Sequence, residues 1–176
     1  MSSRVGVVLA LGLLAACARG QPADAQIRAG AERCMKLFIA SDTRGQLACQ
    51  PRAYVAQLGG DDAAAAFLDE ARRAIDEQGM TIESLEIGEV GRHVTIAERE
   101  FAIVPQVNRI RLPDGVVRNT AYLLAIREPH ETAWTFVNAA PATPRLLARW
   151  YPPTSEAEFS AKLALPAATQ PVREKP

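Results

Sequence analysis

Leu112-Pro113-Asp114-Gly115-Val116 lies between two runs rich in β-branched and aromatic residues, and the expected fold follows from this stretch. A Pro-Asp-Gly triplet supplies a fixed φ, a side chain that can bond to nearby backbone, and a residue that tolerates positive φ. These three properties favour a tight turn. Connections this short require antiparallel neighbours, so residues 81–138 are predicted to form a meander of antiparallel strands.

The expected strands of this meander are 81–90, 93–104, 116–127 and 133–138. Pro105 should interrupt the sheet after the second strand, because proline cannot donate to a strand ladder, and residues 107–112 then lead into the turn. Alternation does not determine which face of 93–104 points inward, because each face mixes charged and apolar residues.

The expected helices before the sheet are 24–41, 51–58 and 62–78. The first has apolar residues at steps of three and four, and the third begins beside two aspartates and ends before Gly79. After the sheet, one short helix is expected at 143–151. The predicted fold class is therefore α+β, with three N-terminal helices packed on an antiparallel sheet of about four strands.

Composition places the chain among soluble globular domains, with 176 residues, 48% hydrophobic and 23% charged. The 20 Lys and Arg residues balance the 20 Asp and Glu residues, and no basic stripe is present. Nucleic-acid binding is not expected, because it normally requires clustered positive charge. The expected domain runs from 24 to 151, and 152–176 is expected to be a proline-marked, largely flexible tail, with a short helix at 156–163 as an alternative within it.

The N-terminus has the pattern of an export signal. Residues 1–16 combine one positive charge with a short apolar run, as in a signal peptide. The run ends in Leu14-Ala15-Ala16-Cys17, which resembles the lipobox of bacterial lipoproteins. That resemblance implies lipid attachment at Cys17, a lipidated tether over 17–23, and a partner in the membrane itself. Because Ala18 rather than Asp follows Cys17, it also implies the outer membrane, facing the periplasm. An ordinary secretory peptide is the alternative.

Cys34 and Cys49 form an even pair once Cys17 is set aside, as expected outside the cytosol. A disulfide between them would contribute on the order of 3 kcal/mol by closing a short loop. A reactive or metal-binding thiol pair is the alternative, but there is neither a C-x-x-C spacing nor a neighbouring histidine. A structural disulfide is the favoured interpretation, and no metal site is expected.

Three segments carry a resemblance to a known fold family: FAIVP at 101–105, YLLAI at 122–126 and AWTFV at 133–137. They resemble uncharacterised bacterial envelope proteins of the nuclear transport factor 2-like (cystatin-like) superfamily over about residues 23–151. The resemblance implies a cone of helices and curved sheet, and its motifs bear on fold more than on function. The small strand pair usual between the second and third helices of that superfamily is not seen here, which implies a smaller cavity.

Residues that could carry chemistry are few, and His93, Glu98, Arg99 and Glu100 are weak candidates. Strict alternation along 93–104 would place His93 and Arg99 on one face and Glu98 and Glu100 on the other. A His93/Arg99 pair in a cavity would suit acid–base chemistry or anion binding. Solvated residues on an outer face are the commoner situation. No established catalytic or cofactor motif is present, so no cofactor is expected.

Three functions are compatible with the sequence. The leading hypothesis is a lipid-anchored, non-catalytic envelope module that binds a small apolar ligand or a protein partner. The first alternative is a cavity enzyme of the isomerase or dehydratase kind, using His93, Glu98 or Glu100. The second is a structural envelope protein without a site. An unfilled cavity, and the polar groups that line it, would distinguish among them.

Overall fold

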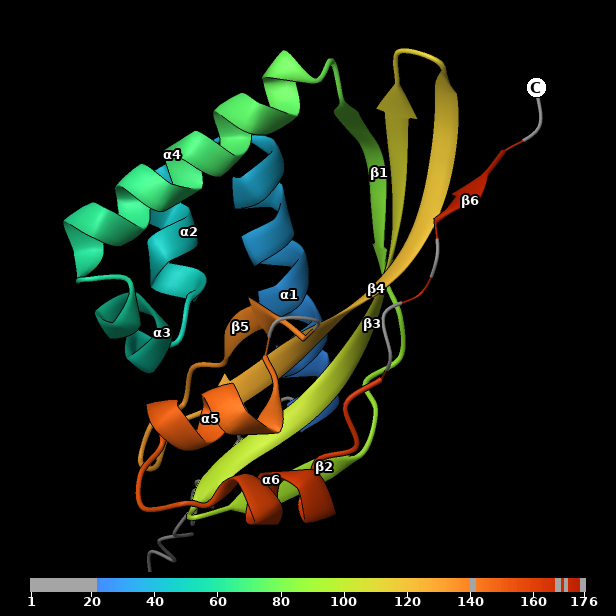
Figure 1. Ribbon diagram of the computed structural model, residues 1–176. Coiled ribbons are helices and arrows are strands. Elements are labelled where there is room, and N and C mark those ends of the chain that lie inside the picture. The colour runs from blue at the N-terminus through green and yellow to red at the C-terminus, as the bar shows by residue number, and fades with distance from the viewer. Residues whose placement is uncertain (1–21, 140–141, 167–168, 170, 175–176) are drawn as a thin grey trace, which may run out of the picture.

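A computed structural model describes residues 22–139, 142–166, 169 and 171–174. The signal peptide and Cys17, both expected from sequence, lie outside these residues. Figure 1 shows an α+β arrangement in which a twisted antiparallel sheet is covered by helices on both faces. Within the described ranges, no helix is both long enough and apolar enough to cross a membrane.

Four helices precede the sheet, where three were expected: α1 (Ala23–Ile39), α2 (Thr43–Cys49), α3 (Arg52–Gln57) and α4 (Asp61–Glu77). The prediction of three was wrong because α2 was taken for the terminator of α1. The chain does turn at Ser41, which adopts a φ of 57°. It then enters a new helix at once, since the Asp42 side chain accepts a hydrogen bond from the Gly45 amide at 2.9 Å.

The described part of the chain forms six strands rather than about four: β1 (Thr81–Ile87), β2 (His93–Ile96), β3 (Arg99–Leu112), β4 (Gly115–Arg127), β5 (Thr135–Asn138) and β6 (Val172–Arg173). Their order is β1-β3-β4-β5, with β2 also paired to β3 and β6 to β4, and every pairing is antiparallel. The predicted Pro-Asp-Gly turn joins β3 to β4, since Leu112 pairs with Gly115.

The expected strand 93–104 is a hairpin instead of one strand. Ala97 and Glu98 both adopt positive φ, 47° and 65°, and Ile96 on one side of them pairs with Arg99 on the other. This is the two-residue geometry usually supplied by Asn-Gly or Asp-Gly. Because neither residue is a turn former, local sequence did not indicate the hairpin.

Pro105 does not interrupt β3, contrary to expectation. It pairs with Tyr122 inside the β3–β4 ladder, and its carbonyl oxygen accepts a hydrogen bond from the Gly88 amide at 2.8 Å. A strand residue directs its nitrogen and its carbonyl to the same neighbour. The proline nitrogen therefore points away from β4, to the side where the regular β1 pairing has already ended at Gln106. No ladder hydrogen bond to β4 is lost.

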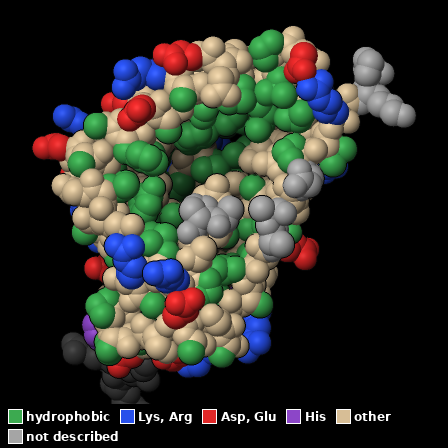
Figure 2. Space-filling model, viewed as in Figure 1, with side chains coloured by type: hydrophobic (Ala, Val, Ile, Leu, Met, Phe, Trp, Pro, Cys, Tyr) green, Lys and Arg blue, Asp and Glu red, His purple; other side chains and the backbone are tan. Residues whose placement is uncertain are grey.

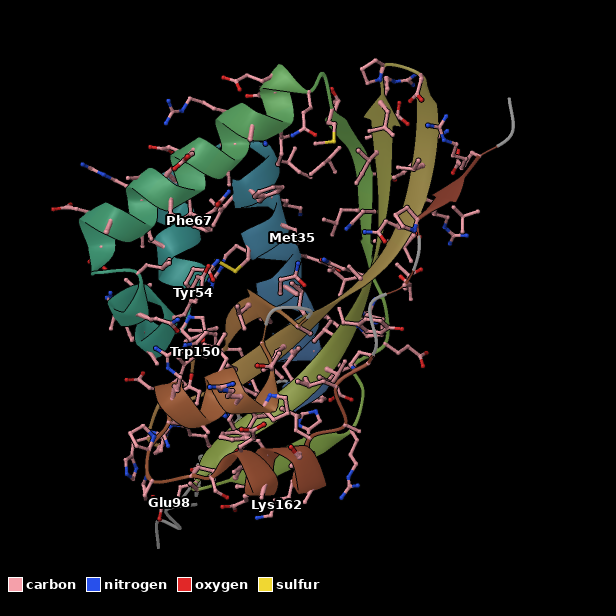
Figure 3. All side chains as sticks on the ribbon, viewed as in Figure 1. Met35, Tyr54, Phe67, Glu98, Trp150 and Lys162 are labelled. Atoms are coloured by element: carbon pink, nitrogen blue, oxygen red, sulfur yellow. A yellow bond between two sulfur atoms is a disulfide. The ribbon has the colours of Figure 1, made fainter. Side chains whose placement is uncertain are left out.

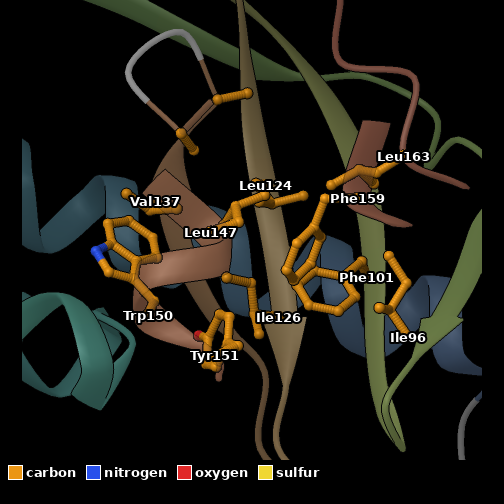
Figure 4. Packing of buried hydrophobic residues seen from close by; sticks show 12 residues of the cluster. Ile96, Phe101, Leu124, Ile126, Val137, Leu147, Trp150, Tyr151, Phe159 and Leu163 are labelled. Carbon is orange, nitrogen blue, oxygen red and sulfur yellow. The ribbon is translucent and has the colours of Figure 1, made fainter. Parts of the chain in front are cut away.

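The lower half of the sheet is buried on both faces. Phe101 belongs to a core that includes the C-terminal helices, whereas Ala102 and Val104 belong to a second core with Ile27 of α1. Alternate residues of β3 therefore pack into different cores on the two faces of the sheet. Figure 4 shows the first of these cores. This double burial explains why alternation in the sequence did not reveal a single inward face.

Two helices follow β5: α5 (Pro144–Trp150), which was expected, and α6 (Glu156–Lys162), which was the alternative within the expected tail. The structure places part of the expected tail in the core, since Phe159 of α6 is fully buried against Phe101. The Ser155 side chain begins α6 by accepting a hydrogen bond from the Glu158 amide. The packed domain thus continues past Tyr151, because the apolar face of α6 covers the end of β2 and β3.

Candidate functional site

A cavity of about 300 Å³ lies in the upper half of the domain, between the sheet and α1, α2 and α4. Figure 2 shows a hollow with hydrophobic walls at this position. Its apolar lining comes from helices and strands alike: Met35, Phe38, Leu68, Ile82, Leu85, Leu123, Phe136 and Val137. A volume near 300 Å³ is at the lower end of the range usual for small-molecule sites.

A bulge in β1 builds one wall of this cavity. Ile82 pairs with Ile110, but the next pair along is Ser84 with Arg109, so the register shifts at this point. The extra residue brings Ile82 and Leu85, which are three apart, to the same face. Glu83 is directed to the other face, where it forms ion pairs with Arg109 and Arg111.

Two amide side chains of β3 also line the cavity. Gln106 is only 6% exposed, and Asn108 is the next inward residue of the same strand. The side-chain oxygens of both residues, Gln106 Oε1 and Asn108 Oδ1, are buried without a hydrogen-bond partner in the described part of the chain. A buried oxygen left unpaired costs about 1–3 kcal/mol. Both atoms are therefore available to accept hydrogen bonds from a bound molecule.

None of the described residues that line the cavity carries an ionisable side chain that is free to titrate. Gln46, Gln50 and Asn138 are uncharged, and Cys34 and Cys49 are bonded to each other. The chemistry offered by these walls is apolar contact combined with hydrogen bonding to amides.

The Cys34–Cys49 disulfide is part of the cavity wall. It joins α1 to α2 with a Cα–Cα distance of 5.9 Å, within the range usual for disulfides, and both half-cystines are buried. Figure 3 shows it between these two helices, with Glu98 far away at the opposite end of the domain. The disulfide expected from sequence is thus present, and both of its residues line the candidate site.

His93 lies at the far end of the sheet from the cavity. Its Nε2 is 2.6 Å from an Asp24 carboxylate oxygen at the start of α1, and its ring meets the Trp134 ring edge-on. His93 pairs with Ala102 across β2 and β3, so it faces α1. Glu98 is exposed in the turn between these strands. Neither side chain lines the cavity.

Arg99 and Glu100 each form an ion pair, and the two pairs lie on opposite faces of the sheet. Arg99 donates to Glu128 at 2.7 Å and stacks over the Tyr151 ring at 4.6 Å. Glu100 accepts from Arg127, which stacks over Trp134. Because the hairpin breaks the alternation, His93 and Arg99 lie on opposite faces of the sheet. The shared face that strict alternation predicted for them was therefore wrong.

Tyr151 supports a prediction about pH. Burial raises the pKa of its hydroxyl, and the negative charge of Glu128 adds to the rise. In the unfolded chain a tyrosine ionises near pH 10. Above that pH the unfolded state releases a proton that the folded state retains, so the free energy of unfolding should fall by about 1.4 kcal/mol per pH unit. Tyr151→Phe should reduce this loss.

Urea unfolding of both proteins between about pH 8 and pH 11 measures the effect. The prediction compares the two slopes, so a difference in stability between the two proteins at pH 8 does not affect it. Tyr54, whose pKa is also raised by burial, stays in both proteins and contributes equally to both slopes. Equal slopes above pH 10 would contradict the prediction.

No protein-family model, curated protein or solved structure matches this chain. The functional argument therefore rests on the geometry of the cavity. Sequence reasoning did not single out Gln106 and Asn108, which are the most informative polar residues of the site. The signal available was two amides at i and i+2 in a strand, on the same face as the apolar Ala102 and Val104.

Proposed function

We propose that this protein is a lipid-anchored envelope module that binds a small, largely apolar ligand in the cavity and does not transform it. The observation that carries the proposal is the unfilled cavity with two unpaired, buried amide oxygens, those of Gln106 and Asn108. Apolar walls favour hydrocarbon, and the amides favour a ligand with one or two hydroxyl or N–H donors.

The anchoring part of the proposal is supported by the lipobox-like Leu14-Ala15-Ala16-Cys17. Only residues 18–22 separate Cys17 from α1, which begins at Ala23. The cavity is lined by the other end of that helix, at Met35 and Phe38. From Asp24 to Phe38 the helix rises about 21 Å, at about 1.5 Å per residue. An anchored chain would thus hold its cavity away from the lipid attachment, with room for a ligand to enter.

The cavity-enzyme alternative required His93, Glu98 or Glu100 at the end of the pocket. His93 is bonded to Asp24, Glu98 is exposed in a turn, and Glu100 is paired with Arg127. Since none of the three lines the cavity, no specific observation favours this alternative over binding.

A neutral fluorescent probe tests the binding proposal. N-phenyl-1-naphthylamine is uncharged and apolar and has one N–H donor, and its emission should rise when it binds the purified domain. Leu68 lines the cavity, so Leu68→Trp should fill part of the space and raise the dissociation constant at least tenfold. Fluorescence titration measures this change.

The matched control is Phe67→Trp at the adjacent position of α4. Phe67 is 46% exposed and does not line the cavity, so this variant should bind the probe as the wild type does. Circular dichroism would verify that both variants are folded. Absence of probe binding to the wild type, or equal affinity of the Leu68→Trp variant, would refute the proposal.

A further inference from the structure

A second recess lies beside the cavity, between α1, α2 and α4. Phe38, Gln46 and Leu68 line both spaces, which are therefore adjacent. The walls of the second recess differ in kind, because Arg72 and Arg73 of α4 line it. An apolar cavity without free ionisable groups thus lies next to a recess, here called the rim, that is lined by two guanidinium groups.

Arg73 has positive charge to offer a ligand. Its side chain is exposed and forms no hydrogen bond or ion pair with any residue in the described ranges. Asp69, a carboxylate in the same recess, accepts a hydrogen bond from the Thr43 hydroxyl. Asp69 is thereby directed toward α2, and the charge of Arg73 has no bonded partner.

Arg72 is held in position by Phe38 but keeps unused N–H donors. Its Nη1 donates to the Phe38 carbonyl oxygen at 3.2 Å, and its guanidinium lies 5.9 Å from the centre of the Phe38 ring. Its Nε is 3.5 Å from an Asp76 carboxylate oxygen but is buried without a hydrogen bond. A guanidinium has five N–H donors. One on Arg72 donates to Phe38 and the Nε–H is buried, so at most three remain for a ligand.

We infer that the ligand is an anionic amphiphile, with its hydrocarbon part in the cavity and a carboxylate or phosphate head group bound by Arg72 and Arg73. This inference rests on the proposed function. A charged head group cannot lie among the apolar walls without a large desolvation cost. At the rim, a planar guanidinium matches the geometry of carboxylate or phosphate oxygens. The side-chain oxygens of Gln106 and Asn108 accept a hydrogen bond from a hydroxyl or N–H group on the hydrocarbon part.

Two probes that differ only in the head group test the inference. 12-Hydroxydodecanoate has a carboxylate at one end and a hydroxyl at the other, and 1,12-dodecanediol replaces the carboxylate by a neutral hydroxyl. Calorimetric titration of the purified domain should give tighter binding of the acid, with an affinity that falls as salt concentration rises. Dodecyl phosphate in a third titration distinguishes a phosphate from a carboxylate preference.

The double variant Arg72→Gln/Arg73→Gln should weaken binding of the acid at least tenfold and leave binding of the diol unchanged. Arg73→Gln alone removes a side chain with no bonded partner, so it should fold normally and weaken acid binding about threefold. The control is Arg145→Gln/Arg149→Gln on α5, which removes the same charge from exposed positions away from the cavity. This control should bind both probes as the wild type does.

The outcomes separate the inference from the function it rests on. Binding of the diol, together with equal affinity of wild type and arginine variants for the acid, overturns the inference and leaves the cavity as a site for neutral ligands. An equal loss in the α5 control also overturns it, because net charge rather than the rim would then be responsible. Failure of both the diol and the acid to bind the wild type overturns the proposed function as well.

Discussion

Replacing Phe101 with alanine is expected to lower the free energy of unfolding by about 3–5 kcal/mol, the usual cost of truncating a fully buried aromatic residue. Phe101 has no exposed surface, and its ring meets those of Phe159 and Tyr151 edge-on, with centroids 5.7 Å and 6.1 Å apart. The substitution leaves a cavity at the point where both C-terminal helices pack on the sheet. Urea unfolding measures the loss.

Phe67→Ala is the matched control, because it removes the same atoms from a side chain that is 46% exposed. We expect it to change the free energy of unfolding by about 0.5 kcal/mol at most. The Phe101→Ala variant should also lose protection of α6 backbone amides from hydrogen exchange, since Phe159 loses its partner. A loss of stability below about 1 kcal/mol would mean that α6 does not depend on this contact.

The second large effect is expected on removing the disulfide. Cys34→Ala/Cys49→Ala should lower the free energy of unfolding by about 3 kcal/mol, because the bond closes a loop of 15 residues. It should also weaken binding of the neutral probe, since the bond holds α1 and α2 at the cavity wall. Urea unfolding and fluorescence titration of the double variant measure the two effects.

Reduction of the wild-type protein provides an independent comparison without any substitution. In a reductant strong enough to open the disulfide, its unfolding midpoint should shift toward that of the double variant. The variant itself should not respond to the reductant, because no bonded cysteine pair remains in the described part of the chain. An unchanged wild-type midpoint, or a variant as stable as the oxidised protein, would show that the bond contributes nothing to stability.

The parts of the fold that were predictable have strong local signals. The Pro-Asp-Gly triplet indicates the β3–β4 connection, and Gly79 beyond a helical pattern indicates the end of α4. The parts that were missed have local sequences that argue against the observed structure. Ala97 and Glu98 are not turn residues, and Gly45 within α2 suggests a turn rather than a helix. In both places tertiary packing overrides local preference.

The candidate site was less predictable than the fold, for a physical reason. His93, Glu98, Arg99 and Glu100 attracted attention because they are charged or titratable, yet three of them bind partners from other elements and the fourth lies exposed in a turn. The cavity is lined instead by neutral amides and apolar residues. Such residues become a site only when segments distant in the chain enclose a space. No local pattern in the sequence indicates that a space will be enclosed.

The amino-acid sequence by itself determined the elements that depend on neighbours along the chain. These are the α+β class, the Pro-Asp-Gly turn and the even pair Cys34 and Cys49, whereas the export-like N-terminus with Cys17 stays a prediction. Only the tertiary structure decided which face of β3 meets which core, and that a cavity remains beside Gln106 and Asn108. The division has one cause: turns, caps and periodicity are set within a few residues, whereas burial and empty space depend on contacts between segments far apart in the chain.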